Sequence, residues 1–179
     1  PELPLRADTP YRLLDVAREA RALVSVGEWR RGIVAALPGN GGERELSWLA
    51  LSFAADLSRD GKLLLFAERG EGAGSTQAVY LRGTNGSTPA VRLGDGFPLA
   101  LSPDTRWALC LGQEGGLEVL PTGPGQPKTI RIEGLEFDQG RWFPDGTRLL
   151  ALGRKKGGPW QSFLVDLAGG SPRPLTPEG

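Results

Sequence analysis

Residues 57–66 read Leu-Ser-Arg-Asp-Gly-Lys-Leu-Leu-Leu-Phe: an apolar residue, a tight turn built on an acid, and an apolar run. The same pattern returns at residues 101–110 and 142–151, and a degenerate copy precedes them at residues 14–24. Counted from acid to acid, the copies are 41, 44 and 41 residues apart, at Glu19, Asp60, Asp104 and Asp145. A period of about 40–45 residues is typical of four-stranded propeller blades. The sequence therefore predicts an all-β fold, a β-propeller segment of four four-stranded antiparallel blades.

The acids of this pattern are explained by turn geometry. An Asp-Gly pair between two runs of β-formers is a strong signal for a hairpin, because Asp hydrogen-bonds its own backbone and Gly accepts a positive φ. Acids repeated at the blade period are distributed around a ring and do not converge on one pocket. We therefore expect Asp60, Asp104 and Asp145 to be turn residues and not catalytic carboxylates.

The remaining strands follow from the apolar pattern within each unit. The second strands are apolar on both faces, as at residues 63–66, so both faces must be covered by neighbouring blades. A third strand and a short fourth strand complete each unit, the fourth around Leu46, Leu93, Ile132 and Leu175. This pattern predicts one domain with blades over residues 11–48, 49–94, 95–133 and 134–179. Residues 1–10 resemble a fourth strand and are expected to belong to a preceding blade, so that the chain is a segment of a longer propeller.

Residues 9–23 allow a second interpretation. Thr9 and Pro10 precede a run of good helix formers, so local propensity alone favours a helix. The spacing to Asp60 and the downstream strands favour a strand, a turn and a second strand. We expect the repeat to override the propensity.

The bulk composition excludes several classes of protein. The 179 residues carry 21 Lys and Arg and 21 Asp and Glu, so the net charge is zero and no basic footprint for nucleic acid is present. No apolar run approaches the ~20 residues that span a bilayer, so we expect no membrane insertion by this segment. The single cysteine, Cys110, lies in an apolar run and is expected in the core.

No catalytic constellation is visible. The chain has no histidine, which excludes a Ser-His-Asp triad, a Cys-His pair and a histidine metal site within it. A Gly-x-Ser-x-Gly elbow and a Walker-type phosphate loop are also missing from the sequence. We expect no catalytic residue, no cofactor and no metal ion.

The loops between second and third strands provide candidate partner-binding residues. By the alternation of strand direction, these loops emerge on one face of the disc, and aromatic and arginine side chains are enriched at binding hot spots. Solvated loops account for the same composition, and that alternative stays open. If the chain binds a protein or peptide through these loops, their positive charges favour an acidic partner. The candidate residues are Trp29, Arg30, Arg31, Arg69, Lys155, Lys156 and Trp160.

The combination of Leu-Ser-x-Asp-Gly-Lys with an apolar strand, a Tyr-Leu or Leu-Val-Asp strand, Gly-Gly and Pro-Leu-Thr resembles the TolB-type, WD-like β-propeller repeat. The resemblance runs from about Tyr11 to Gly179, is weaker at Thr105 and is poor at residues 18–20. Residues 44–49, 81–86 and 90–94 are most similar to the propeller regions attached to bacterial serine/threonine kinases. No kinase motif accompanies them.

The resemblance implies a non-catalytic module for protein or ligand recognition within a larger bacterial protein. More specifically, it implies the sensor region of a serine/threonine kinase. Two alternatives stay open: the gating propeller of a prolyl-oligopeptidase-like serine peptidase, and a TolB-like envelope protein. Open edges of a partial propeller also favour a homo-oligomer.

Overall fold

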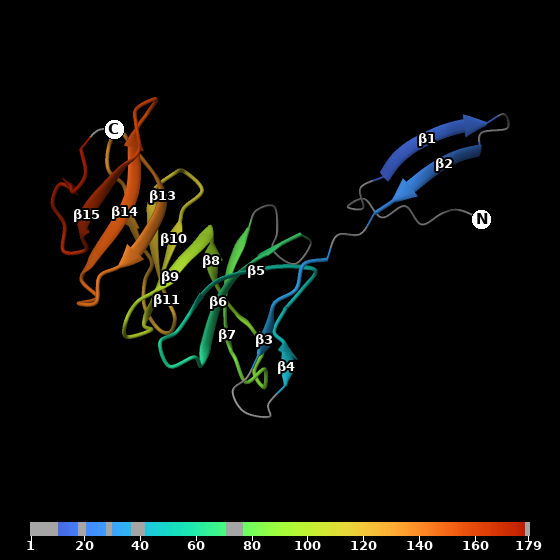
Figure 1. Cartoon of the computed structure of the whole chain (residues 1–179), viewed down its shortest axis with the longest axis horizontal. Coiled ribbons are helices and arrows are strands. Elements are labelled where there is room, and N and C mark those ends of the chain that lie inside the picture. The colour runs from blue at the N-terminus through green and yellow to red at the C-terminus, as the bar shows by residue number, and fades with distance from the viewer. Residues whose placement is uncertain (1–10, 18–20, 28–29, 37–41, 71–76, 178–179) are drawn as a thin grey trace.

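The computed structural model describes residues 11–17, 21–27, 30–36, 42–70 and 77–177, and every element in these ranges is a β-strand (Figure 1). The predicted all-β class is therefore confirmed. The outer strand expected at residues 1–10 lies outside the described residues. No helix long and apolar enough to cross a membrane occurs in the described ranges.

Twelve of the strands form three antiparallel sheets in which neighbours in sequence are neighbours in the sheet. The first contains β5 (Leu51–Leu57), β6 (Leu63–Arg69), β7 (Ala78–Gly83) and β8 (Val91–Asp95). The second contains β9 (Phe97–Leu101), β10 (Trp107–Leu111), β11 (Leu117–Pro121) and β12 (Lys128–Ile130). The third contains β13 (Leu135–Trp142), β14 (Arg148–Lys155), β15 (Gln161–Asp166) and β16 (Arg173–Pro174). These sheets have the topology expected of propeller blades.

The first unit differs from the expected four-stranded blade. β1 (Tyr11–Ala17) and β2 (Arg21–Val26) form one hairpin, while β3 (Val34–Ala36) and β4 (Glu43–Glu45) form a separate two-stranded sheet. The prediction of two strands instead of a helix at the start of the chain is confirmed. β2 and β3 lie in separate sheets, and the backbone of Arg31, between them in the sequence, pairs in parallel with Leu51 of β5. Figure 1 shows the hairpin apart from the sheets.

The hydrophobic core lies between the sheets. Leu65, Leu109 and Leu149, from the second strands of the three complete sheets, are all 0% exposed. Each sheet shares an apolar cluster with its neighbour, and β3 and β4 cover the outer face of the β5–β8 sheet around Phe66 and Tyr80. Burying a leucine side chain contributes about 1.5–3 kcal/mol. β6 and β10 are therefore covered on both faces, as expected, whereas β14 buries Leu149 but leaves Leu150 41% exposed on its other face.

Cys110 is buried in β10, as the sequence predicts. Burial raises the pKa of its thiol far above the usual range, and the negative charge of Glu118 adds to the rise. The thiolate is the reactive form of cysteine, so Cys110 is an inert core residue.

The tight turns are built by side-chain hydrogen bonds to the backbone. Ser58 Oγ donates to Asp60 Oδ1 at 2.7 Å, and the amide of Lys62 donates to Asp60 Oδ1 at 3.1 Å. Ser102 and Asp104 repeat this arrangement, with a serine-to-aspartate distance of 2.6 Å. These hydrogen bonds hold the pKa of Asp60 and of Asp104 below its ordinary value, and the largest contribution in each turn is the serine hydroxyl. The two acids act as turn residues.

The first strand of every unit carries a β-bulge. The pairing with the second strand skips one residue in each case, at Leu14 of β1, Ala55 of β5, Leu99 of β9 and Asp138 of β13. A bulge inserts one unpaired residue and redirects its side chain. The bulge is thus a further feature of the repeat, and it is present in β1 as well as in the three complete sheets.

Candidate functional site

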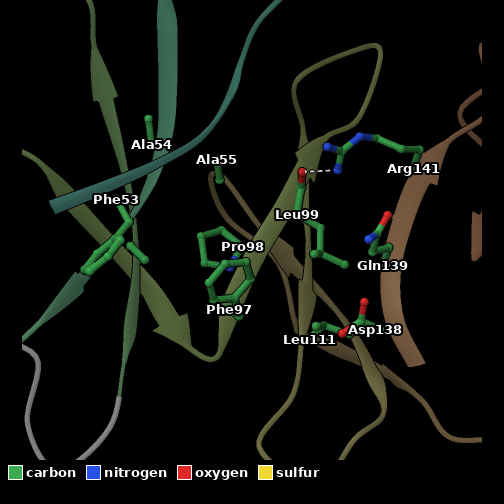
Figure 2. Close-up of a pocket in the computed structure, with 11 residues that line it drawn as sticks. Phe53, Ala54, Ala55, Phe97, Pro98, Leu99, Leu111, Asp138, Gln139 and Arg141 are labelled. Carbon is green, nitrogen blue, oxygen red and sulfur yellow. Dashed lines mark hydrogen bonds between the residues drawn. The ribbon is translucent and has the colours of Figure 1, made fainter. Parts of the chain in front are cut away.

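The first strands of the three complete sheets line a cavity with a volume of about 540 Å³. Its floor is apolar and includes Phe53, Phe97 and Pro98 (Figure 2). The three bulge residues Ala55, Leu99 and Asp138 all line it. The bulges therefore determine which side chains face the cavity.

Polar groups of β13 form the opposite wall of this cavity. Asp138, Gln139 and Arg141 line it, and Figure 2 shows all three on the strand across from Phe53. The guanidinium of Arg141 donates to the carbonyl oxygen of Leu99 at 2.5 Å and to that of Gly140 at 3.1 Å. Arg141 thus ties β13 to β9 while it presents positive charge to the cavity.

Arg31 and Arg69, two of the residues selected from the sequence, meet on the ring of Phe53. The guanidinium carbon of Arg31 is 4.5 Å from the ring centroid, and that of Arg69 is 5.1 Å from it. Each contact of this kind contributes about 0.5–1 kcal/mol at an exposed site. Phe53 also lines the cavity, whereas neither arginine belongs to its lining.

The backbone holds both arginines in place. The amide of Arg31 donates to Ala50 at 2.9 Å, and its carbonyl accepts from the amide of Ser52 at 2.9 Å. Arg69 is the last residue of β6, and its Nε donates to Gln77 Oε1 at 2.7 Å. The convergence of the two side chains is therefore fixed by strand positions.

Neither arginine forms an ion pair with an acid in the described part of the chain. Glu68 precedes Arg69 in the sequence but is fully buried, where Oε1 accepts hydrogen bonds from Ser52 Oγ and from the amide of Leu49. Both guanidinium groups contact one aromatic ring, and arginine forms charge-assisted, bidentate hydrogen bonds with carboxylates. The pair is therefore suited to bind a carboxylate.

The other candidate residues lie elsewhere. Trp29 is outside the described residues, and Arg30 is exposed next to Arg31. Lys155 and Lys156 are exposed at the end of β14, and Trp160 is stacked under Arg154, whose guanidinium carbon is 4.5 Å from the ring centroid. No contact between described residues joins this second group to Arg31 and Arg69. The structure therefore brings Arg31 and Arg69 together on one ring, and Arg30 and Arg31 line a separate cavity of about 440 Å³.

Four residues of this site were not predicted from the sequence: Phe53, Asp138, Gln139 and Arg141. One signal was present, because β13 contains the polar residues Asp138, Gln139 and Arg141, whereas the first strand of the preceding sheet, β9, is entirely apolar. Their convergence with Phe53 depends on bulges and on contacts between sheets, which no local pattern encodes. Among the described residues, no cluster of three or more His, Cys, Asp or Glu side chains could hold a metal ion.

Comparison with known proteins identifies the fold. No family model and no curated protein matches the sequence. The structure is similar to TolB from Acinetobacter baumannii, with a TM-score of 0.60 and 19% identity over 78% of this chain and 36% of that one. It is similar to a puromycin-hydrolysing peptidase from Mycobacterium tuberculosis, with a TM-score of 0.62 and 18% identity over 97% of this chain and 31% of that one.

An oligogalacturonate lyase from Vibrio parahaemolyticus is also similar, with a TM-score of 0.56 and 15% identity over 94% of this chain and 47% of that one. Identities this low show the fold alone, which is that of TolB-like β-propeller proteins. The chain spans less than half the length of each of these three proteins.

Proposed function

We propose that this chain is a non-catalytic segment of a β-propeller that binds an acidic stretch of a protein or peptide partner, as part of a larger protein. The observation that carries the proposal is the pair of arginines on Phe53, a residue that also lines the 540 Å³ cavity. Acidic side chains of the partner bind the two guanidinium groups, and apolar neighbours in the same peptide enter the cavity. Charge-assisted hydrogen bonds to arginine make such recognition specific for carboxylates.

A labelled hexaglutamate peptide tests the proposal, with a hexaglutamine peptide of the same length as its reference. We expect the chain to bind hexaglutamate in a fluorescence anisotropy titration and to bind hexaglutamine much more weakly. The affinity for hexaglutamate falls as salt is added, because exposed charges are screened.

Matched variants locate the site. Arg31→Gln and Arg69→Gln each weaken the binding of hexaglutamate by about tenfold, the loss expected for one charge-assisted contact. Lys62→Gln is the control, because the Lys62 side chain is 80% exposed at the opposite end of β6. Equal affinity for the two peptides, or equal losses in all three variants, would contradict the proposal.

A gating propeller of a serine peptidase is a second candidate role. It is supported by the alignment of 97% of this chain with the puromycin-hydrolysing peptidase. An α/β-hydrolase domain encoded in the same polypeptide would favour this role. The kinase-sensor form of the proposal rests on the resemblance of residues 44–49, 81–86 and 90–94 alone, and a kinase domain in the same polypeptide would favour it.

A further inference from the structure

The β1–β2 hairpin exposes side chains that the complete sheets bury. Leu23 pairs with Asp15, the residue after the bulge of β1, and it is 59% exposed. The residues that pair with the position after the bulge in the next two sheets, Leu65 and Leu109, are both 0% exposed. The hairpin therefore has the composition of a buried element and lacks a covering surface.

A complementary surface is exposed beside β3. A cavity of about 520 Å³ is lined by Ile33 and Val34 next to Ala54, Leu57 and Leu64 of β5 and β6. Leu57 and Val34 are exposed large apolar residues of this surface. In the following sheet, Leu101 occupies the position of Leu57, two residues after the bulge, and is buried by its neighbours. The face of β5 and β6 thus lacks the cover that the next sheet has.

A repeated aspartate shows how the two surfaces fit. Asp15 follows the bulge of β1 and accepts the amide of Val16 at 2.8 Å through Oδ1. Asp56 follows the bulge of β5 and accepts the amide of Leu57 at 2.9 Å in the same way. The second oxygen of Asp56 reaches the next sheet, where it accepts the amide of Leu101 at 2.7 Å. By the repeat, the second oxygen of Asp15 corresponds to a contact with the amide of Leu57, which Asp15 would then share with Asp56 Oδ1.

The connection is long enough for the hairpin of the same chain. Seven residues separate β2 from β3, whereas eight separate β6 from β7 and five separate β10 from β11. Connections between consecutive strands are short because such strands are neighbours in space. A hairpin from a second copy is therefore not needed.

We propose that the β1–β2 hairpin docks within its own chain onto the face formed by β3, β5 and β6, and completes a sheet with the strand order β1-β2-β3-β4. In this arrangement β2 pairs with β3, Leu23 is buried against the β5–β8 sheet, and Asp15 Oδ2 accepts the amide of Leu57. The docked hairpin covers Leu57 and Val34.

Amide hydrogen exchange of Leu57 tests the docking. Leu23→Asp places a carboxylate in the docked interface, and we expect it to accelerate exchange at Leu57 by about tenfold or more, since a buried unpaired charge disfavours docking. Val91→Asp is the matched control, because Val91 of β8 is 57% exposed and lies outside the interface. This control leaves the exchange of Leu57 within about twofold of the parent value, as is usual for surface substitutions.

The aspartates provide a second pair of variants that leaves the apolar surfaces intact. Asp15→Ala accelerates exchange at Leu57, whereas Asp56→Ala accelerates exchange at Leu101 and calibrates the size of the effect. Equal exchange at Leu57 in the parent chain, Leu23→Asp and Asp15→Ala would overturn the proposal. Protection of Leu57 that rises with protein concentration would overturn it too, because the hairpin would then come from a second copy.

Discussion

Thr105 follows the aspartate of its tight turn, at the position that glycine occupies in the other two turns. Its φ is 59°, next to 72° for Gly61 and 70° for Gly146. A residue with a Cβ in this left-handed region is destabilised by about 1–2 kcal/mol. The turn of the second complete sheet therefore carries local strain that its neighbours lack.

Thr105→Gly should stabilise the chain by about 0.5–1 kcal/mol, because removal of the strain outweighs the added entropy of glycine in the unfolded state. Gly61→Thr is the reciprocal variant, and an added Cβ at Gly61 meets nothing within 4 Å. It should destabilise by a similar amount. Urea denaturation measures both, and effects of the same sign in the two variants would contradict this account.

Asp145 makes the third turn sensitive to acid. Its carboxylate accepts the amide of Thr147 at 2.9 Å and Nε of Arg148 at 2.7 Å. The Thr147 amide, and next Arg148, lower the pKa of Asp145 from 3.8 to about 2. Because the pKa is lower in the folded state, the contribution to stability is complete above about pH 4 and is lost as the pH falls toward 2.

Asp145→Asn should therefore be less stable than the parent chain at neutral pH, and the difference should shrink between about pH 4 and pH 2. Thermal unfolding followed by circular dichroism over that range measures it. A difference that stays constant down to pH 2 would show that the carboxylate charge is not responsible.

The crossovers between sheets are the critical elements of the fold. Gly96 joins β8 to β9 with a φ of 119°, and an added Cβ would lie 2.5 Å from the carbonyl oxygen of Leu111. That oxygen belongs to the backbone of β10 and cannot move away without breaking the sheet. The sharp turn into the first strand of the second sheet therefore requires glycine.

Gly96→Ala should destabilise the chain by about 3 kcal/mol, the sum of the conformational strain and the overlap with the strand. Gly115→Ala is the matched control: its φ is 79°, and an added Cβ meets nothing within 4 Å. It should lose only about 1 kcal/mol. Equal losses in denaturant titrations would mean that the contact with Leu111 is unimportant.

At the scale of the whole molecule, stability is shared between neighbouring sheets. Leu149 lies in the apolar cluster between the β9–β12 and β13–β16 sheets, whereas a separate cluster around Phe66 joins the β5–β8 sheet to β3 and β4. In repeat architectures each unit contacts mainly its neighbours. A defect in one interface should therefore act first on the sheets that share it.

Leu149→Ala should lower the free energy of unfolding by about 2–5 kcal/mol, as is usual for a leucine in a core. Native-state hydrogen exchange should accelerate in β10 and β14 before β6. The next residue provides the control, since Leu150 is 41% exposed and Leu150→Ala should change stability by less than about 1 kcal/mol. Uniform acceleration in all three sheets would contradict the neighbour-only coupling.

The repeat made most strands and all three tight turns predictable because hairpin chemistry is local: Asp60 and Gly61 determine their turn with partners a few residues away. The cavity was not predictable in the same way. The position of Asp138 depends on a bulge, and the meeting of Arg31 with Arg69 depends on a parallel contact between Arg31 and Leu51. The first unit departed from expectation because β3 and β4 pack against the β5–β8 sheet, while β1 and β2 form a separate hairpin.

The burial of Cys110 makes the chain suitable for site-directed labelling. A cysteine introduced on the surface would react with a maleimide dye in the native state, while the native thiol, 0% exposed, would remain protected. With excess reagent and long incubation, the rate at which Cys110 itself is modified would measure how often its sheet separates from the neighbouring sheet.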